Sequence, residues 1–188
     1  MSKAAFRGGV HPPENKEATA ASAIEWMPVP TRLVVPMSQH LGAPCAPTVA
    51  AGDRVRRGQV IGSVAAMVSA PIHSPVDGEV ASLGMTLTVG GMRVPAIMIT
   101  PDAEQDLSTF VPVPEGDVRA TVRAAGIVGL GGATFPSAVK LSPPKDLAVH
   151  TVVLNGCECE PYLTCDHRLM VESPERVVAG ARIIGETI

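Results

Sequence analysis

The feature that most constrains the fold is a succession of short apolar runs and turn residues between Thr31 and Thr100. Each run ends in turn chemistry such as A-A-G-D, R-R-G-Q, P-V-D-G or G-G. Runs of this length at close spacing are typical of an all-β sandwich or barrel. The whole chain of 188 residues holds 18 Gly and 18 Pro but only one Trp, one Tyr and three Phe. This composition favours many turns over a helical bundle.

Two half-motifs within this region specify the fold more closely. The first reads V-x-x-G-D-x-V-x-x-G-Q-x-I from Val49, and the second reads A-P-x-x-S-P-x-D-G-x-V from Ala70. Together they resemble the barrel-sandwich hybrid fold of biotinyl and lipoyl carrier domains. Asp-Gly pairs supply the left-handed positions of tight hairpins, and we expect the alternating Val and Ile residues to line a narrow core.

A carrier domain also needs a lysine at its exposed hairpin, where the prosthetic group is attached. The hairpin expected to bear it reads A-A-M-V-S at residues 65–69, and no lysine occurs between Lys16 and Lys140. A lipoyl or biotinyl carrier is therefore disfavoured, and an unmodified intact mass would exclude it.

The sequence predicts four parts. Residues 1–30 are rich in Pro and Gly and form an extended arm packed along another part of the protein; residues 31–100 form the β domain. Residues 101–114 form an acidic linker punctuated by proline. Residues 115–188 form the first half of an α/β, Rossmann-like domain. The predicted fold class is therefore an α+β chain in two parts.

The period of the apolar residues changes after the linker. Helical spacing predicts a helix over 118–125, with Gly126 as its stop signal, and a second over 135–141. The run H-T-V-V-L-N at His150–Asn155 predicts a buried strand of a parallel sheet. The S-P-E sequence at 173–175 predicts the start of another helix. In such a succession, ligands bind beyond the carboxyl ends of the strands.

Two stretches carry the candidate site. Four of the seven residues from Gly126 to Gly132 are glycine. Such a cluster indicates a need for positive φ or for close approach of a ligand. The loop is not a Walker A motif and departs from the dinucleotide fingerprint, so phosphate binding and a tight structural turn both stay open. The second stretch is N-G-C-E-C-E-P from Asn155, at the predicted strand end. Its presence favours phosphate binding by the glycine loop over a purely structural turn.

Five side chains have a functional interpretation, and all of them except Asn155 have a structural one as well. Lys140 meets a phosphate or an electron-rich ring, or it is a surface lysine at a helix end. Phe135 stacks on an aromatic cofactor or anchors the core. Asn155 suits recognition of a ring edge or a ribityl hydroxyl. Glu158 and Glu160 face a ligand crevice, or they lie in a solvated loop.

The composition and the cysteines exclude several other functions. Cys157, Cys159 and Cys165 have a C-x-C-x5-C spacing that fits neither ferredoxin clusters nor structural zinc, so no metal site is predicted. His40 and His167 receive no role. A net charge of −3 with dispersed charges excludes an electrostatic footprint for nucleic acid. We expect neither a secretory signal nor a membrane span.

Taken together, four stretches resemble the C subunit of the Rnf, or ion-translocating oxidoreductase, complex. They are F-R-G-G-V-H-P-P-E-N-K from Phe6, A-P-x-x-S-P-V-D-G-E-V from Ala70, G-I-V-G-L-G-G-A-T-F-P-S-A-V-K-L from Gly126 and N-G-C-E-C-E-P-Y-L-T from Asn155. The resemblance implies a barrel-sandwich hybrid followed by a domain similar to the complex I flavoprotein, which binds FMN and NADH. No catalytic acid or base is implied, since the cofactor carries the chemistry.

The resemblance also implies roles for particular residues. The cofactor-binding residues would be Gly129, Gly131, Gly132, Phe135, Lys140, Asn155, Glu158 and Glu160. The glycines would approach FMN and its phosphate, Phe135 would stack on the nucleotide, and Lys140 and Asn155 would hydrogen-bond the flavin. Both glutamates would border the flavin and the nicotinamide. Cys157 stands where the complex I flavoprotein has Asp, and Cys159 where it has Ser.

At the level of the whole protein, the resemblance implies a subunit that oxidises NADH through FMN and passes electrons to iron–sulfur centres. It would lie peripherally on the cytoplasmic face of the cell membrane, held by other subunits. The 4Fe–4S motifs are expected beyond Ile188, so the chain corresponds to an amino-terminal portion that is inactive alone. The alternative is a non-catalytic docking or scaffold module of the same complex, without nucleotide binding.

Overall fold

The computed structural model describes residues 12–144, 146 and 148–188. Two compact units can be distinguished by their internal contacts. The first, called here the helical unit, combines the residues up to Trp26 with Val153–Ala181. The second, called the β unit, combines Met27–Val152 with Arg182–Ile188.

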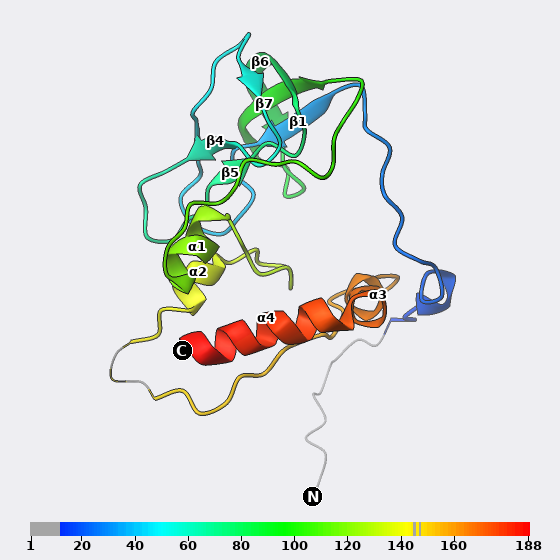
Figure 1. Cartoon of the computed structure of the whole chain (residues 1–188). Helices are drawn as coiled ribbons and strands as arrows, with labels where there is room; N and C mark the ends of the chain where they lie inside the picture. The colour runs from blue at the N-terminus through cyan, green and yellow to red at the C-terminus, as the bar shows by residue number, and fades with distance from the viewer. Residues whose placement is uncertain (1–11, 145, 147) are drawn as a thin grey trace, which may run out of the picture. The chain divides into compact units, whose positions relative to one another are not determined.

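The β unit contains two small antiparallel sheets (Figure 1). One has the strand order β1-β7-β6-β3 and the other β2-β4-β5. The strands are β1 (Leu33–Pro36), β2 (Ala46–Pro47), β3 (Arg54–Val55), β4 (Val60–Ser63), β5 (Ile72–His73), β6 (Gly78–Leu87) and β7 (Arg93–Pro101). Short strands separated by turns confirm the all-β prediction for this region.

A single apolar cluster forms the core of the β unit. Its buried members are Val35, Met37, Cys45, Val55, Ile61, Ile72, Val76, Val80, Ile97 and Ile99. Full burial of one such aliphatic side chain contributes roughly 1.5–3 kcal/mol. The turns that the sequence predicted close between these strands. In the A-A-G-D turn, for example, the Asp53 carboxylate accepts a hydrogen bond from the Ala50 amide at 2.7 Å.

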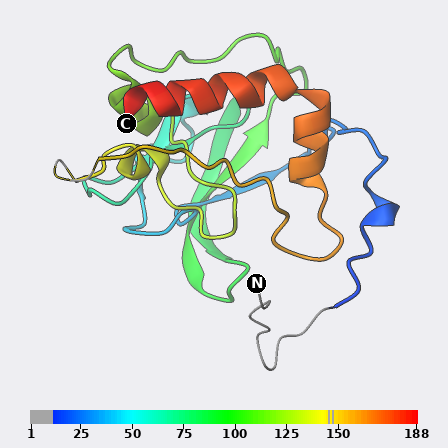
Figure 2. The ribbon, with the colours of Figure 1, turned by 90° about the horizontal axis from the view of Figure 1, so that it is seen from below.

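The longest strand pair is the β6–β7 hairpin, which Figure 2 shows as a long antiparallel ribbon. Its register runs from Gly78 opposite Pro101 to Leu87 opposite Arg93, with an irregularity between Val80 and Ser82. Such an irregularity bends and twists a strand, which suits a sheet curled around a small core.

The segment after β7, residues 102–114, contains no helix or strand but lies along the β strands. The Gln105 side chain donates to the Asp77 carbonyl at 2.8 Å and accepts from the Asp77 amide at 2.9 Å. The Val111 amide donates to the Arg57 carbonyl at 2.8 Å. Hydrogen bonds to the β domain therefore hold this segment, while the four-part division predicted from the sequence stays a prediction.

Two short helices follow within the β unit. Helix α1 (Val118–Ala124) begins after Asp117, whose carboxylate accepts from the Ala120 amide at 2.8 Å. It ends before Gly126, which has a φ of 67°. The predicted helix and its stop signal are confirmed. Helix α2 (Ser137–Lys140) is shorter than predicted, because Pro136 pairs with Val128 across the preceding loop.

The helical unit contains a 3₁₀ turn, η1 (Lys16–Ala18), the helix α3 (Cys165–Glu172) and most of α4 (Pro174–Thr187). Helix α4 begins at the S-P-E sequence as predicted. Helix α3 was not predicted, although an Arg168–Glu172 ion pair at 2.6 Å, four residues apart, supports it. Among the described residues, no helix is both long and apolar enough to cross a membrane.

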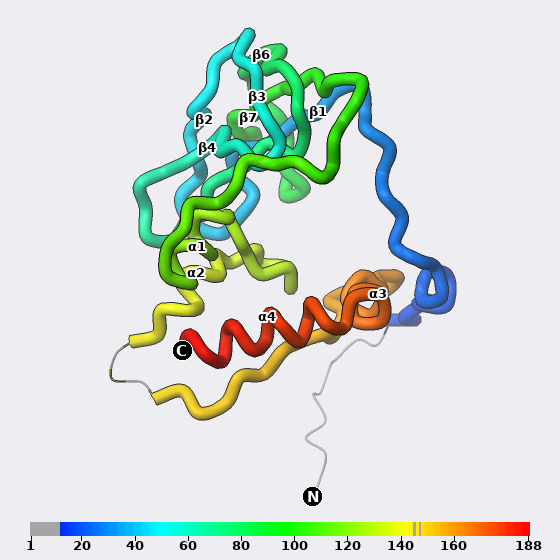
Figure 3. Tube along the Cα trace, viewed as in Figure 1, coloured from blue at the N-terminus to red at the C-terminus, as the bar shows by residue number. Residues whose placement is uncertain are grey.

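The strand predicted at His150–Asn155 is wrong. Residues 148–158 form an irregular segment, which Figure 3 traces between α2 and α3. Val153 and Leu154 are 83% and 55% exposed. A buried parallel strand requires neighbouring strands on both edges, and all strand pairs within the described ranges are antiparallel. The Rossmann-like arrangement predicted for residues 115–188 is therefore not confirmed.

Candidate functional site

The glycine loop is a narrow turn whose tip faces open space. The Gly129 amide donates to the Phe135 carbonyl at 2.9 Å, and the Ser137 amide donates to the Ile127 carbonyl at 2.9 Å. These bonds draw the two ends of the loop together. At Gly131 and Gly132, an added Cβ would meet no heavy atom within 4 Å. The backbone at the tip is therefore accessible to a ligand.

Lys140 lies over this loop. Its Nζ would be only 2.5 Å from a Cβ placed on Gly129, so the ammonium occupies the space that a side chain there would need. Within the described ranges, the ammonium has no hydrogen-bond acceptor. Exposed backbone amides beside an uncommitted cation form a donor set that suits an anion such as a phosphate. The residues of this loop therefore fit the phosphate end of a nucleotide cofactor.

The second predicted stretch uses several of its polar groups internally. Asn155 Oδ1 accepts from the Cys157 amide at 3.0 Å. The Glu158 carboxylate accepts from the His167 amide at 3.0 Å, at the start of α3. That backbone hydrogen bond is the main reason why the pKa of Glu158 lies below its usual value. Glu158 therefore satisfies a free amide of the first turn of α3, a structural role that the sequence did not reveal.

A pocket of about 240 Å³ adjoins these glutamates within the helical unit. Its lining residues are Pro12, Glu14, Lys16, Glu158, Cys159, Glu160 and Pro161. Lys16 Nζ donates to the carbonyls of Glu160, at 3.3 Å, and Leu163, at 3.0 Å. Drug-sized ligands occupy pockets of roughly 300–1,000 Å³, so this space suits only part of a cofactor.

Lys16 and Glu14 are the residues of this pocket that the sequence reasoning missed. The Tyr162 amide donates to the Glu14 carbonyl at 2.8 Å, which joins the arm to the loop after Glu160. The available signal was the motif H-P-P-E-N-K, which belongs to the first of the four stretches that carry the family resemblance.

The predicted cofactor-binding residues thus fall into two sets. Gly129, Gly131, Gly132, Phe135 and Lys140 belong to the β unit, whereas Asn155, Glu158 and Glu160 belong to the helical unit. The half-buried Phe135 contributes its carbonyl to the glycine loop. That both sets form one FMN site stays a prediction.

The four cysteines are free thiols that differ in burial. Cys45 is buried, whereas Cys157, Cys159 and Cys165 are exposed. Cys165 Sγ lies within 4.8 Å of possible ligand atoms of Glu158 and Asp166. Its thiol donates to Glu158 at 3.5 Å, and desolvation together with this carboxylate raises the pKa of Cys165. A protonated thiol that hydrogen-bonds a carboxylate accounts for this cluster.

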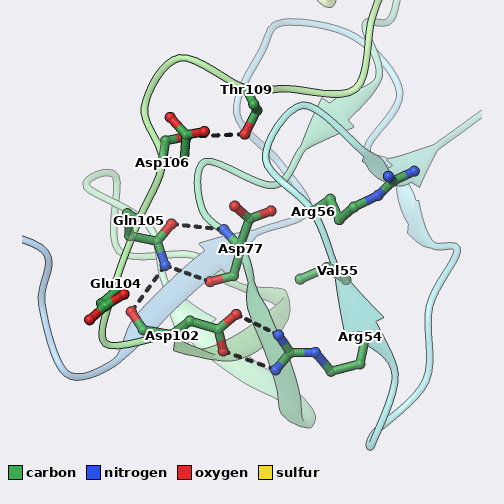
Figure 4. Close-up of a pocket in the computed structure, with 9 residues that line it drawn as sticks. All are labelled: Arg54, Val55, Arg56, Asp77, Asp102, Glu104, Gln105, Asp106 and Thr109. Carbon is green, nitrogen blue, oxygen red and sulfur yellow. Dashed lines mark hydrogen bonds and ion pairs between the residues drawn. The ribbon is translucent and has the colours of Figure 1, made fainter.

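A larger pocket of about 760 Å³ lies elsewhere in the β unit (Figure 4). Arg54 forms a two-pronged ion pair with Asp102, whose pKa this guanidinium holds below its usual value. Gln105 joins the backbones of Asp77 and Asp102 across the same groove. Because these polar groups pair with one another, the groove is the seam along which residues 102–114 attach to the β strands.

Comparisons with known proteins match two stretches of the chain to two family models. Residues 4–104 match the family model RnfC Barrel sandwich hybrid domain, and residues 122–188 match the model Nuo51 FMN-binding domain. A relative from Clostridium ljungdahlii, the C subunit of a "Proton-translocating ferredoxin:NAD(+) oxidoreductase complex", is 44% identical. The alignment covers 95% of this chain and 41% of that protein.

Two further relatives also match almost the whole of this chain but less than half of their own length. The C subunit of a "Na(+)-translocating ferredoxin:NAD(+) oxidoreductase complex" from Acetobacterium woodii is 42% identical over 97% of this chain and 43% of the relative. The C subunit of an "Ion-translocating oxidoreductase complex" from Rhodobacter capsulatus is also 42% identical, over 97% of this chain and 37% of the relative. The chain therefore spans about two fifths of the length of these relatives.

Two small antiparallel sheets around one core, together with the family match, define the β domain as a barrel-sandwich hybrid. Its hairpin lacks the lysine of a carrier domain. The chain belongs to the family of the Rnf complex C subunits and corresponds to their amino-terminal region.

Proposed function

We propose that this chain binds FMN through its glycine loop and Lys140, and that it serves in electron transport as part of the C subunit of an Rnf-type complex. The observation that carries the proposal is the position of the Lys140 ammonium over Gly129, beside a loop tip with accessible backbone. The match of residues 122–188 to an FMN-binding domain supports the same cofactor.

The chain's own residues would bind and orient the cofactor. The amides of the loop tip and the Lys140 ammonium would neutralise the phosphate, because backbone N–H groups and a lysine side chain both favour an anion. The Asn155 amide group would hydrogen-bond the ring system, while Glu158 and Glu160 would border the flavin and the nicotinamide. FMN, when bound, supplies the ability to take a hydride from NADH and to release single electrons.

The wider function follows from the relatives. Two of them are named for reactions between ferredoxin and NAD(+) in ion-translocating complexes. We therefore assign NADH as the nicotinamide substrate and iron–sulfur centres as the next electron carriers. The partners are the other subunits of a membrane complex, on whose cytoplasmic face this chain lies peripherally. Co-sedimentation of the chain with membranes that contain the complex, and its loss from membranes without it, tests this location.

The test of the cofactor titrates FMN into the purified chain and into its longest natural form, with flavin fluorescence as the signal. Lys140→Met retains the length of the side chain and removes the charge, so the dissociation constant rises about tenfold. Arg32→Met removes an exposed positive charge far from the loop in sequence and leaves affinity unchanged. Absence of binding by the folded wild-type proteins, or equal affinity of the Lys140 variant, contradicts the proposal.

The alternative is a docking module without nucleotide affinity. The internal hydrogen bonds of Asn155 and Glu158 favour it, since these groups already have protein partners. It predicts that the folded chain captures the other subunits of its complex and leaves FMN unbound. Tight FMN binding excludes it.

A further inference from the structure

The hairpin that bears the lysine in carrier domains has a different partner in this chain. Arg123, at the end of α1, donates from Nη2 to the carbonyls of Ala66 at 2.6 Å and Met67 at 2.9 Å. Its Nη1 donates to the Met67 carbonyl at 3.1 Å. The hairpin at residues 65–69 is therefore held by a guanidinium fork, whose charge-assisted hydrogen bonds are stronger than neutral ones.

The first residue of the glycine loop rests on the same side of the β domain. A Cβ placed on Gly126 would lie 2.4 Å from the Pro71 carbonyl oxygen and 3.1 Å from His73 Cε1. Figure 1 shows α1 and α2 beside the end of the β domain that carries β5. The imidazole of His73 is partly buried there, and desolvation lowers its pKa. Only glycine fits this contact at a φ of 67°.

The returning end of the glycine loop is also tied to the β domain. The Leu41 amide donates to the carbonyl of Thr134 at 3.3 Å, and Thr134 has a left-handed φ of 47°. The neighbouring Ala43 amide donates to the Val68 carbonyl at 3.1 Å, which links Leu41's turn to the hairpin at residues 65–69. Both ends of the glycine loop are thus fixed to one continuous surface of the β domain.

From these contacts we infer that the barrel-sandwich hybrid domain is a template for the glycine loop, and that Arg123 is the positioning residue that joins the two. A loop with four glycines has a large conformational entropy, and binding a ligand would require ordering it. Fixing both ends before the ligand arrives reduces that cost. The hairpin that carries a swinging arm in other proteins is here a fixed anchor. The consequence for affinity rests on the proposed FMN function.

The experiment compares Arg123→Met, which removes the donors, with Arg123→Lys, which keeps the charge, and with Arg32→Met as a surface control. Hydrogen exchange is measured at the protected amides of Gly129 and Ser137 and in the β6–β7 hairpin. Arg123→Met accelerates exchange at the two loop amides about tenfold and leaves the hairpin unchanged, because only local opening is affected. Arg123→Lys restores part of the protection, and Arg32→Met changes nothing.

FMN titration supplies the second readout. Arg123→Met weakens binding about fivefold to tenfold, and Arg123→Lys recovers part of the affinity. Unchanged exchange at the loop, or equal acceleration throughout the β unit, overturns the template role. Faster loop exchange with unchanged FMN affinity overturns the positioning role. If the wild-type protein binds no FMN, the proposed function fails, whereas the exchange data still decide whether the β domain holds the loop.

Discussion

Gly126→Ala probes the contact between the glycine loop and the β domain. Alanine at a φ of 67° has a left-handed backbone, which costs roughly 1–2 kcal/mol relative to glycine. In addition, the new Cβ would lie 2.4 Å from the Pro71 carbonyl oxygen. This neighbour is backbone, so the loop and β5 must separate. We expect a total loss of about 2–4 kcal/mol in the free energy of unfolding.

Gly91→Ala provides the matched control. Gly91 has a φ of 77° in the β6–β7 turn, and an added Cβ there would meet no heavy atom within 4 Å. This variant therefore loses only the backbone term, about 1–2 kcal/mol. Urea unfolding followed by circular dichroism gives both values, and their difference isolates the contact with Pro71. Equal losses for the two variants would refute the close contact between loop and β domain.

Three further variants test other contacts. His73→Gln removes a side chain whose pKa is lowered in the folded state, so the unfolded chain binds a proton below about pH 6.5 more readily than the folded protein does. The free energy of unfolding of the wild type therefore falls as the pH is lowered through that value. Urea unfolding at several pH values measures this fall, which is smaller in the variant; an equal fall in both proteins contradicts the expectation. Lys16→Met removes two hydrogen bonds to carbonyls and lowers the stability of the helical unit by about 1 kcal/mol in thermal unfolding. Arg32→Met, the control, leaves this stability unchanged. An unchanged melting curve for Lys16→Met counts against these contacts. Asp117→Ala removes the cap of α1 and lowers the free energy of unfolding by about 1 kcal/mol, as measured by chemical unfolding. Asp117→Asn can still cap the helix and loses only a small part of this stability. Equal losses in the two variants would show that the cap is unimportant.

The elements that the sequence predicted well depend on local chemistry. Asp117 and Gly126 delimit α1 because a carboxylate satisfies a free amide at one end and glycine adopts the left-handed conformation at the other. The turn around Asp53 closes for similar reasons. Within the candidate site, Lys140 lies near Gly129 because one short turn and a single helical turn separate them, while its predicted role at a phosphate stays a prediction.

The elements that failed depend on partners far away in the chain. The run at His150–Asn155 has the composition of a buried strand, yet it lies exposed because no described strand pairs with it. The place of Glu158 at a ligand crevice stays a prediction, and the structure adds a hydrogen bond from the His167 amide to its carboxylate, which the sequence did not reveal. For the run at His150–Asn155 the residue types favoured a strand, but the absence of a pairing strand among the described residues decided the outcome.

The sequence by itself therefore determined the turns, both ends of α1, the barrel-sandwich hybrid and the membership in the family of Rnf complex C subunits, since each rests on motifs within a short stretch of chain. Only the tertiary structure decided that Lys16 contacts the loop after Glu160 and that Arg123 holds the hairpin at residues 65–69. These contacts join residues 144 and 57 positions apart. Their energy comes from satisfying carbonyls that only folding brings within reach.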